Sequence, residues 1–269
     1  MSNLVEMFSY GFMVRALIVG VLISFSAALI GVPLVLRKNS MLGDGLSHVA
    51  FAAFAIALAL GLVPIPVAIP VVIVISFLVL RFGNTVKMNG DAVIALVSVG
   101  ALAVGVFVTS LVGANVDINS YLFGSVLSVG ENEVWLAAIL ALVVVGIYVT
   151  FHNKIFAVTF DEKFARAIGI NVKFYNGVFA ILCSVLIVLG MRLMGALLVS
   201  SLIVIPTLSA QMVFRKFRSV TVASAVLAVF NFVIGLVVSY LLATPTGATV
   251  VIVNLVALVV LKVLDMIVK

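Results

Sequence analysis

The chain has 269 residues, of which 65% are hydrophobic and 9% are charged, and its mean hydropathy is +1.46. This composition excludes an ordinary soluble domain and is typical of a membrane protein with several spanning helices. The formal net charge of +6 does not indicate nucleic-acid binding, because the basic residues are spread over short loops between apolar runs.

Nine apolar runs follow one another along the chain, and each is expected to be a helix because irregular backbone is excluded from the lipid core. One run could be short or re-entrant, which would leave eight spans. We therefore predict an all-α polytopic membrane protein with a single transmembrane domain over residues 1–269 and eight or nine spanning helices. The runs cover residues 10–36, 41–61, 64–80, 92–113, 134–151, 174–191, 193–214, 219–242 and 247–268.

The basic residues predict the orientation of the chain. With nine spans, all the breaks that are rich in Lys and Arg fall on one side, and only Arg15 and Arg192 lie elsewhere. The positive-inside rule assigns that side to the cytoplasm. The N-terminus is then expected outside and the C-terminus inside.

The second run contains the polar segment Gly43-Asp44-Gly45-Leu46-Ser47-His48 near its start. Asp44 and His48 are four positions apart and would share one face of a helix. Ionisable residues in a membrane helix are energetically costly and usually mark a functional site. A carboxylate and an imidazole one turn apart can supply two ligands to a divalent ion such as zinc. The alternative is that Asp44 caps the helix and His48 only pairs with it.

Two further segments connect the runs. Residues 115–125 mix aromatic and polar side chains, including Tyr121, Leu122 and Phe123. We predict a short interfacial or re-entrant helix that closes the outer mouth, with an aromatic loop at headgroup level as the alternative.

The longest cytoplasmic break, about residues 152–173, contains signals for a short free-standing helix. Thr159 or Asp161 can cap its start and Gly169 can end it. One face is apolar, which suits docking into a groove on another protein or, alternatively, lying on the membrane surface. The apolar residues are Phe160, Phe164, Ala167 and Ile168.

These segments, followed by Gly195–Ser200 with Pro206 and by Pro245–Ala248, occur in the same order in a known family. Nearly end to end, the chain resembles the zinc and manganese permease subunits of ATP-binding cassette (ABC) importers. The resemblance implies a homodimer in the lipid of the bacterial inner membrane, with an ABC ATPase subunit on each copy. It also implies an extracytoplasmic metal-binding protein that delivers the ion. The metal is cargo, and no intrinsic cofactor is expected.

The resemblance also implies roles for individual residues. Asp44 and His48 would be the metal ligands, and the helix around Phe164 would be the coupling helix that contacts the ATPase through Asp161, Glu162, Phe164, Ala165 and Gly169. Tyr121, Leu122 and Phe123 would belong to an outer gate. The residues after His48 lack the proline of many manganese members, which favours zinc over manganese or iron. Gly45 stands where relatives more often have Ala or Thr and predicts a looser local helix.

Other function classes fit the sequence less well. The chain has no Gly-x-x-x-x-Gly-Lys-Ser/Thr loop for nucleotide and is not expected to be an enzyme. An ion-coupled secondary transporter would need more buried acids than Asp44 alone. An intramembrane metalloprotease is excluded because His-Glu-x-x-His is absent and the chain has two histidines.

Overall fold

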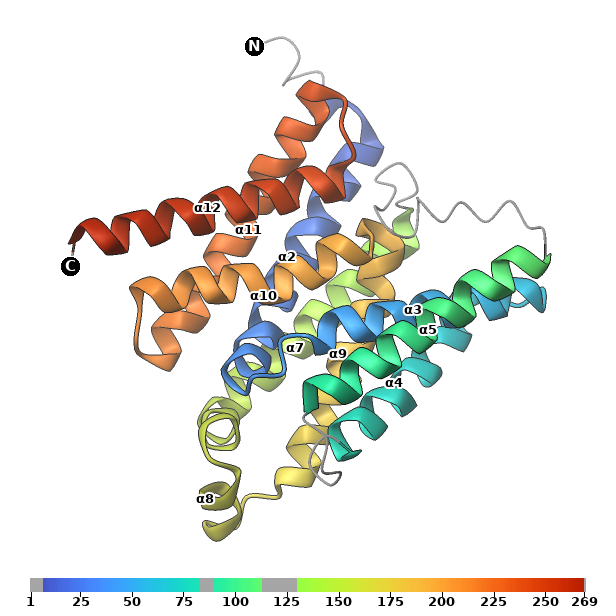
Figure 1. The fold of residues 1–269 in the computed structure, drawn as a ribbon. Helices are drawn as coiled ribbons and strands as arrows, with labels where there is room; N and C mark the ends of the chain where they lie inside the picture. Colours follow the sequence, from blue (N-terminus) through green and yellow to red (C-terminus); the bar gives the residue numbers. More distant parts are fainter. Residues whose placement is uncertain (1–6, 83–89, 113–129, 269) are drawn as a thin grey trace.

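The computed structural model describes residues 7–82, 90–112 and 130–268, and these residues form helices and no strand (Figure 1). The helices are α2 (Gly11–Leu36), α3 (Leu42–Ala59), α4 (Pro64–Phe82), α5 (Gly90–Val112), α7 (Glu131–Phe160), α8 (Glu162–Ala167), α9 (Val172–Met194), α10 (Ala196–Val213), α11 (Phe217–Leu242) and α12 (Thr246–Val268).

Eight of these helices are long and apolar enough to cross a membrane, and α4 contributes a shorter apolar segment, Pro64–Leu80. The predicted all-α polytopic architecture with a short additional helix is therefore confirmed. All backbone hydrogen bonds of a helix interior are made within the helix, which is why such apolar sequences take this form in lipid.

Helix α7 extends beyond its predicted end. The apolar run stops at Phe151, where the backbone leaves helical geometry with φ −113° and ψ 18°, but the helix continues to Phe160. Ile155 and Val158 in this extension are each 1% exposed, so packing against the rest of the protein supports it. The first part of the predicted coupling loop is therefore helical.

The helices form two flanks around a buried centre. On one flank, α3 packs against α4 and α5 (Figure 1). On the other flank, α11 and α12 pack together, and α10 contacts each of these two helices. Helix α2 contacts α7, α9, α10 and α11, and most of its length is buried. In the centre, α2 contacts α11 of the second flank, α9 contacts α3 and α4 of the first, and α2 and α9 contact each other.

A small residue allows α2 and α10 to approach closely. A Cβ atom at Gly31 of α2 would lie 2.1 Å from the backbone oxygen of Ile203 in α10, so only glycine fits there. Gly100 in α5, by contrast, has open space around its missing side chain. Small residues in this chain therefore mark a helix contact at Gly31 but not at Gly100.

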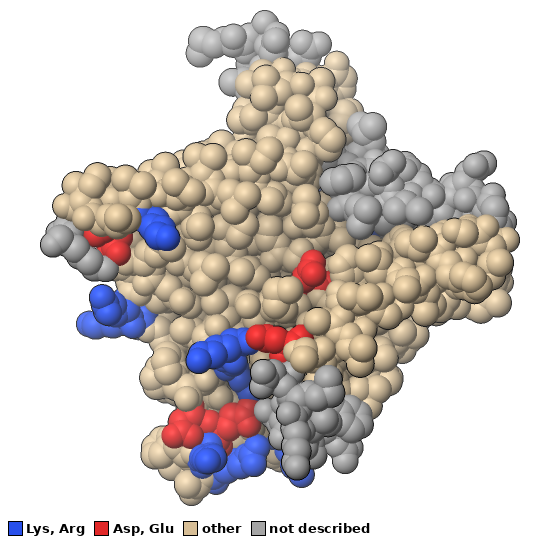
Figure 2. Space-filling view, viewed as in Figure 1, with Lys and Arg blue, Asp and Glu red and all other residues tan. Residues whose placement is uncertain are grey.

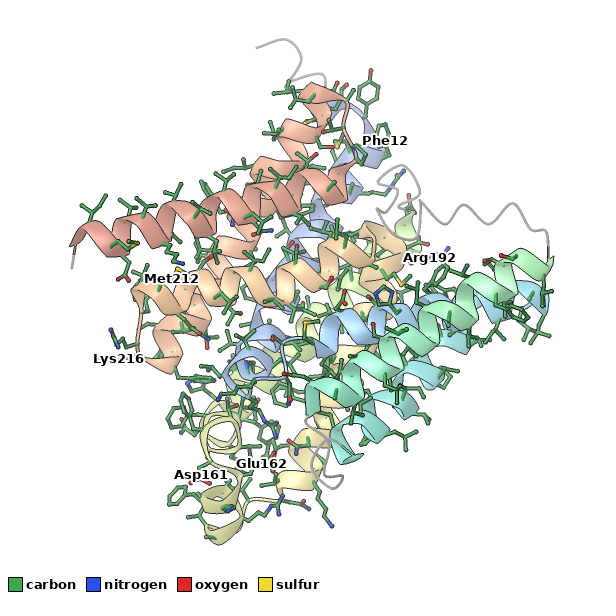
Figure 3. All side chains as sticks on the ribbon, viewed as in Figure 1. Phe12, Asp161, Glu162, Arg192, Met212 and Lys216 are labelled. Atoms are coloured by element: carbon green, nitrogen blue, oxygen red, sulfur yellow. The ribbon has the colours of Figure 1, made fainter. Side chains whose placement is uncertain are left out.

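Charged side chains gather at one end of the bundle. In the face shown in Figure 2, Lys and Arg lie over the lower and left parts of the molecule. The same region contains α8 and the α10–α11 connection with Lys216, whereas Arg192 lies at the opposite end of the bundle (Figure 3). Arg192 is paired there with Glu133 at 3.5 Å. This segregation matches the pattern that the positive-inside rule requires.

Candidate metal site and coupling helix

Asp44 lies in the first turn of α3, but it does not cap the helix. The N-cap residue is Met41, and no side chain makes a cap hydrogen bond there. The alternative interpretation of Asp44 as a hydrogen-bonded helix cap is therefore wrong. Its carboxylate is free of that role and remains 46% exposed.

Asp44 and His48 lie on one face of α3, as the four-residue spacing predicts. The distance between Asp44 Oδ2 and His48 Nε2 is 3.8 Å, which is too long for a hydrogen bond. His48 is 21% exposed, and its Nδ1 atom is buried without a hydrogen-bond partner among the described residues. Ser47 does not join the pair, because its hydroxyl donates to the Asp44 carbonyl at 2.7 Å and its side chain is buried.

The Asp44–His48 geometry fits two ligands of one ion. Nitrogen and oxygen donors at about 2.0–2.2 Å from a tetrahedral ion are about 3.4 Å apart. The observed separation of 3.8 Å differs from that value by an amount that a side-chain rotation can supply. Among the residues that the structure describes, no group of three or more His, Cys, Asp and Glu side chains could hold an ion. Within the described part of the chain, Asp44 and His48 are therefore a pair of candidate ligands and not a complete set.

The two glycines beside Asp44 hold α3 against its neighbours. A Cβ atom at Gly43 would lie 3.1 Å from Ile203 Cδ1, and one at Gly45 would lie 2.8 Å from Ile94 Cγ2. Gly45 was expected to leave the helix looser, but Ile94 of α5 occupies the space of the missing side chain. The turn that carries Asp44 is thus packed on two sides.

Helix α8 begins and ends as the sequence predicts. The Asp161 carboxylate accepts hydrogen bonds from the backbone N–H groups of Lys163 and Phe164 at 2.9 and 3.0 Å. Thr159, the other candidate cap, instead donates to Ile155 within α7. Gly169 follows the helix with φ +83°, a conformation that glycine adopts without strain.

The side chains of α8 and of its C-cap residue, Ile168, divide into two groups. Phe164 and Ile168 are 57% and 54% exposed, whereas Ala165 is fully buried. Glu162 turns toward the bundle, where it pairs with Arg37, and also contacts Arg166 at 3.2 Å. Phe164 therefore faces away from the chain, but Glu162 already has partners within it.

Arg37 and Asn176 are residues of this region that the sequence did not single out. Arg37 follows α2, and its guanidinium donates to Asn176 Oδ1 of α9 at 2.8 Å as well as to Glu162. Burial lowers the pKa of Arg37 from its ordinary value, while the charge of Glu162 opposes that effect. The only signal in the sequence was a basic residue at the end of a span, which predicted orientation and no contact.

The predicted outer gate of Tyr121, Leu122 and Phe123 lies outside the described residues.

Comparison with known proteins identifies the family. Residues 9–265 match the ABC 3 transport family. The chain belongs to this family. A relative from Treponema pallidum described as a probable metal transport system membrane protein is 29% identical, covering 94% of this chain and 95% of its own. The manganese transport system membrane protein MntC of Listeria innocua is 25% identical, with coverages of 91% and 87%.

A solved structure has the same fold. PsaBC from Streptococcus pneumoniae in complex with Fab superposes with a TM-score of 0.86 over 97% of this chain and 94% of that chain, at 22% identity. Together with the ABC 3 match, these likenesses confirm the predicted membership among metal-transport permeases.

Proposed function

We propose that the chain is the permease of an importer that moves a divalent metal ion, zinc as the first candidate, into the cytoplasm. The observation that carries this proposal is the Asp44–His48 pair on α3, with donor atoms 3.8 Å apart and an aspartate that makes no cap hydrogen bond. Ionised carboxylate and neutral imidazole are ligands of zinc.

The site is completed by a second copy of the chain. Zinc prefers four ligands, and one chain offers two at helical spacing. In a two-fold symmetric dimer the same surface patch is contributed by both subunits, so two Asp44–His48 pairs placed near the axis would supply four ligands. Water and backbone oxygens would complete a half-site if the two pairs remain apart.

Energy comes from a separate ABC ATPase subunit that docks on α8. The exposed Phe164 and Ile168 provide the apolar contact for a groove on that partner. An extracytoplasmic metal-binding protein delivers the ion on the opposite side of the bacterial inner membrane. The chain itself catalyses no covalent step in this scheme.

Manganese is the second candidate cargo. The names of relatives favour it, because MntC of Listeria innocua is described as a manganese transport protein. Aspartate and histidine oxygen and nitrogen donors also suit manganese, so the ligand types alone do not separate the two ions.

Metal uptake by vesicles that contain the permease and its ATPase tests the proposal. We expect His48→Gln and Asp44→Asn to abolish uptake of the transported ion without preventing assembly with the ATPase. The matched controls are His152→Gln, at the other histidine of the chain, and Asp91→Asn, in the first turn of α5. Competition between zinc and manganese, measured in the same vesicles, identifies the cargo. Parental uptake in both pair variants would remove Asp44 and His48 from the pathway.

A further inference from the structure

Three side chains from three separate elements form a closed set of polar contacts. Arg37 pairs with Glu162, Arg37 also donates to Asn176 Oδ1 at 2.8 Å, and Asn176 Nδ2 donates to Glu162 Oε1 at 3.2 Å. The Arg37 and Glu162 side chains are 15% and 27% exposed, so solvent screens their interaction less than at an open surface. We call this set the α8 clamp.

The α8 clamp is the principal polar connection between α8 and the bundle. Asp161 uses its carboxylate within α8 itself, as the N-cap. Ala165 is the residue of α8 that is buried, and it belongs to a small cluster with Val158, Val172 and Tyr175. A six-residue helix with one small buried side chain has little apolar attachment, so Glu162 fixes much of its position.

At its other end, the clamp is tied to the start of α3. After Arg37 the chain turns with Lys38 at φ +60°, and Asn39 donates its N–H back to the Leu34 carbonyl at 2.9 Å. Leu42, the first residue of α3, donates to the Asn39 carbonyl at 3.1 Å. This hydrogen-bonded turn leaves little slack between Arg37 and Asp44, seven positions later.

We propose that Arg37 and Glu162 are positioning residues that transmit movement of α8 to the metal-bearing end of α3. When the ATPase displaces α8, Glu162 draws Arg37 with it, and the turn after Arg37 shifts the segment that carries Asp44. Glu162 then acts within the permease and not, as the sequence suggested, in contact with the ATPase. The inference rests on the proposed function of α8 and of the Asp44–His48 pair.

The number of ATP molecules hydrolysed per ion transported, measured with the assembled permease and ATPase in vesicles, tests the clamp. We expect Arg37→Gln and Glu162→Gln each to raise this ratio about tenfold, a typical size for coupling within one polar network. The double variant should be no worse than either single variant, because each removes the same connection. Lys173→Gln, which removes an exposed cation at the start of α9, is the control and should keep the parental ratio.

Three outcomes would overturn the proposal: an unchanged ratio, single effects that multiply in the double variant, or an equal rise in Lys173→Gln. If a glutamine variant loses the ATPase, Arg37→Lys replaces it, since lysine keeps the charge but not the simultaneous contacts with Glu162 and Asn176. A parental ratio in Arg37→Lys would then overturn the proposal. Clamp variants should keep parental equilibrium metal binding, whereas Asp44→Asn should lose it, so failure of the metal assignment is seen separately.

Discussion

Phe164 is the side chain whose replacement tests most directly whether α8 docks on an ATPase. It is 57% exposed although it is a large apolar group on the basic end of the bundle. A phenylalanine presents about 200 Å² of surface, so about 115 Å² remains open on Phe164. Covering that area at about 25 cal/mol per Å² contributes about 3 kcal/mol, or about a hundredfold in a dissociation constant.

Phe164→Asp removes this contribution and leaves the permease folded. The residue is the third of the α8 first turn, counted after the Asp161 cap, where an acidic side chain interacts favourably with the helix dipole by about 0.3–1 kcal/mol. We expect the ATPase to bind at least about a hundredfold more weakly, because a carboxylate would also lose its hydration in an apolar groove. Titration of detergent-solubilised permease with labelled ATPase measures the effect.

Phe174→Asp is the matched control for this measurement. Phe174 is also 57% exposed, but it belongs to the first turn of α9 and not to α8. It should leave the ATPase affinity within a fewfold of the parental value. Equal affinity for the Phe164 variant and the parent would refute the docking argument. If Phe164→Asp weakened binding to lipid vesicles and left the ATPase affinity unchanged, α8 would be assigned to the membrane surface.

Four further outcomes follow from the structure. Asp161→Ala leaves two N–H groups of α8 unpaired and should destabilise the helix by about 1 kcal/mol, seen as faster amide exchange in α8, whereas Asp161→Ser should retain most protection. Lys38→Gly should raise the thermal unfolding midpoint, because lysine at φ +60° costs about 1 kcal/mol, and Lys38→Ala should not. In a Cys183→Ala background, an impermeant thiol reagent added to intact cells should label Glu131→Cys but not Lys163→Cys; the reverse would invert the proposed orientation. Zinc binding should be lost in His48→Gln, because the change removes the imidazole donor, and unchanged binding would exclude His48 as a ligand.

The apolar runs determined the helices, because a chain in lipid has few ways to satisfy its backbone other than by helices. The same local rules located the ends of α8. Asp161 caps its own first turn and Gly169 ends the helix, so neither contact depends on a distant part of the chain. The shared face of Asp44 and His48 likewise follows from a spacing of four residues.

Tertiary packing decided what these side chains contact. Glu162 had the character of an exposed acid at the start of a helix, but it pairs with Arg37, 125 positions away. Gly45 indicated looseness, whereas Ile94 from α5 occupies the space beside it. Helical periodicity specifies which residues share a face, but it carries no information about which other helix lies against that face. For this reason the sequence predicted the two candidate ligands, and only the packed bundle joined their helix to α8.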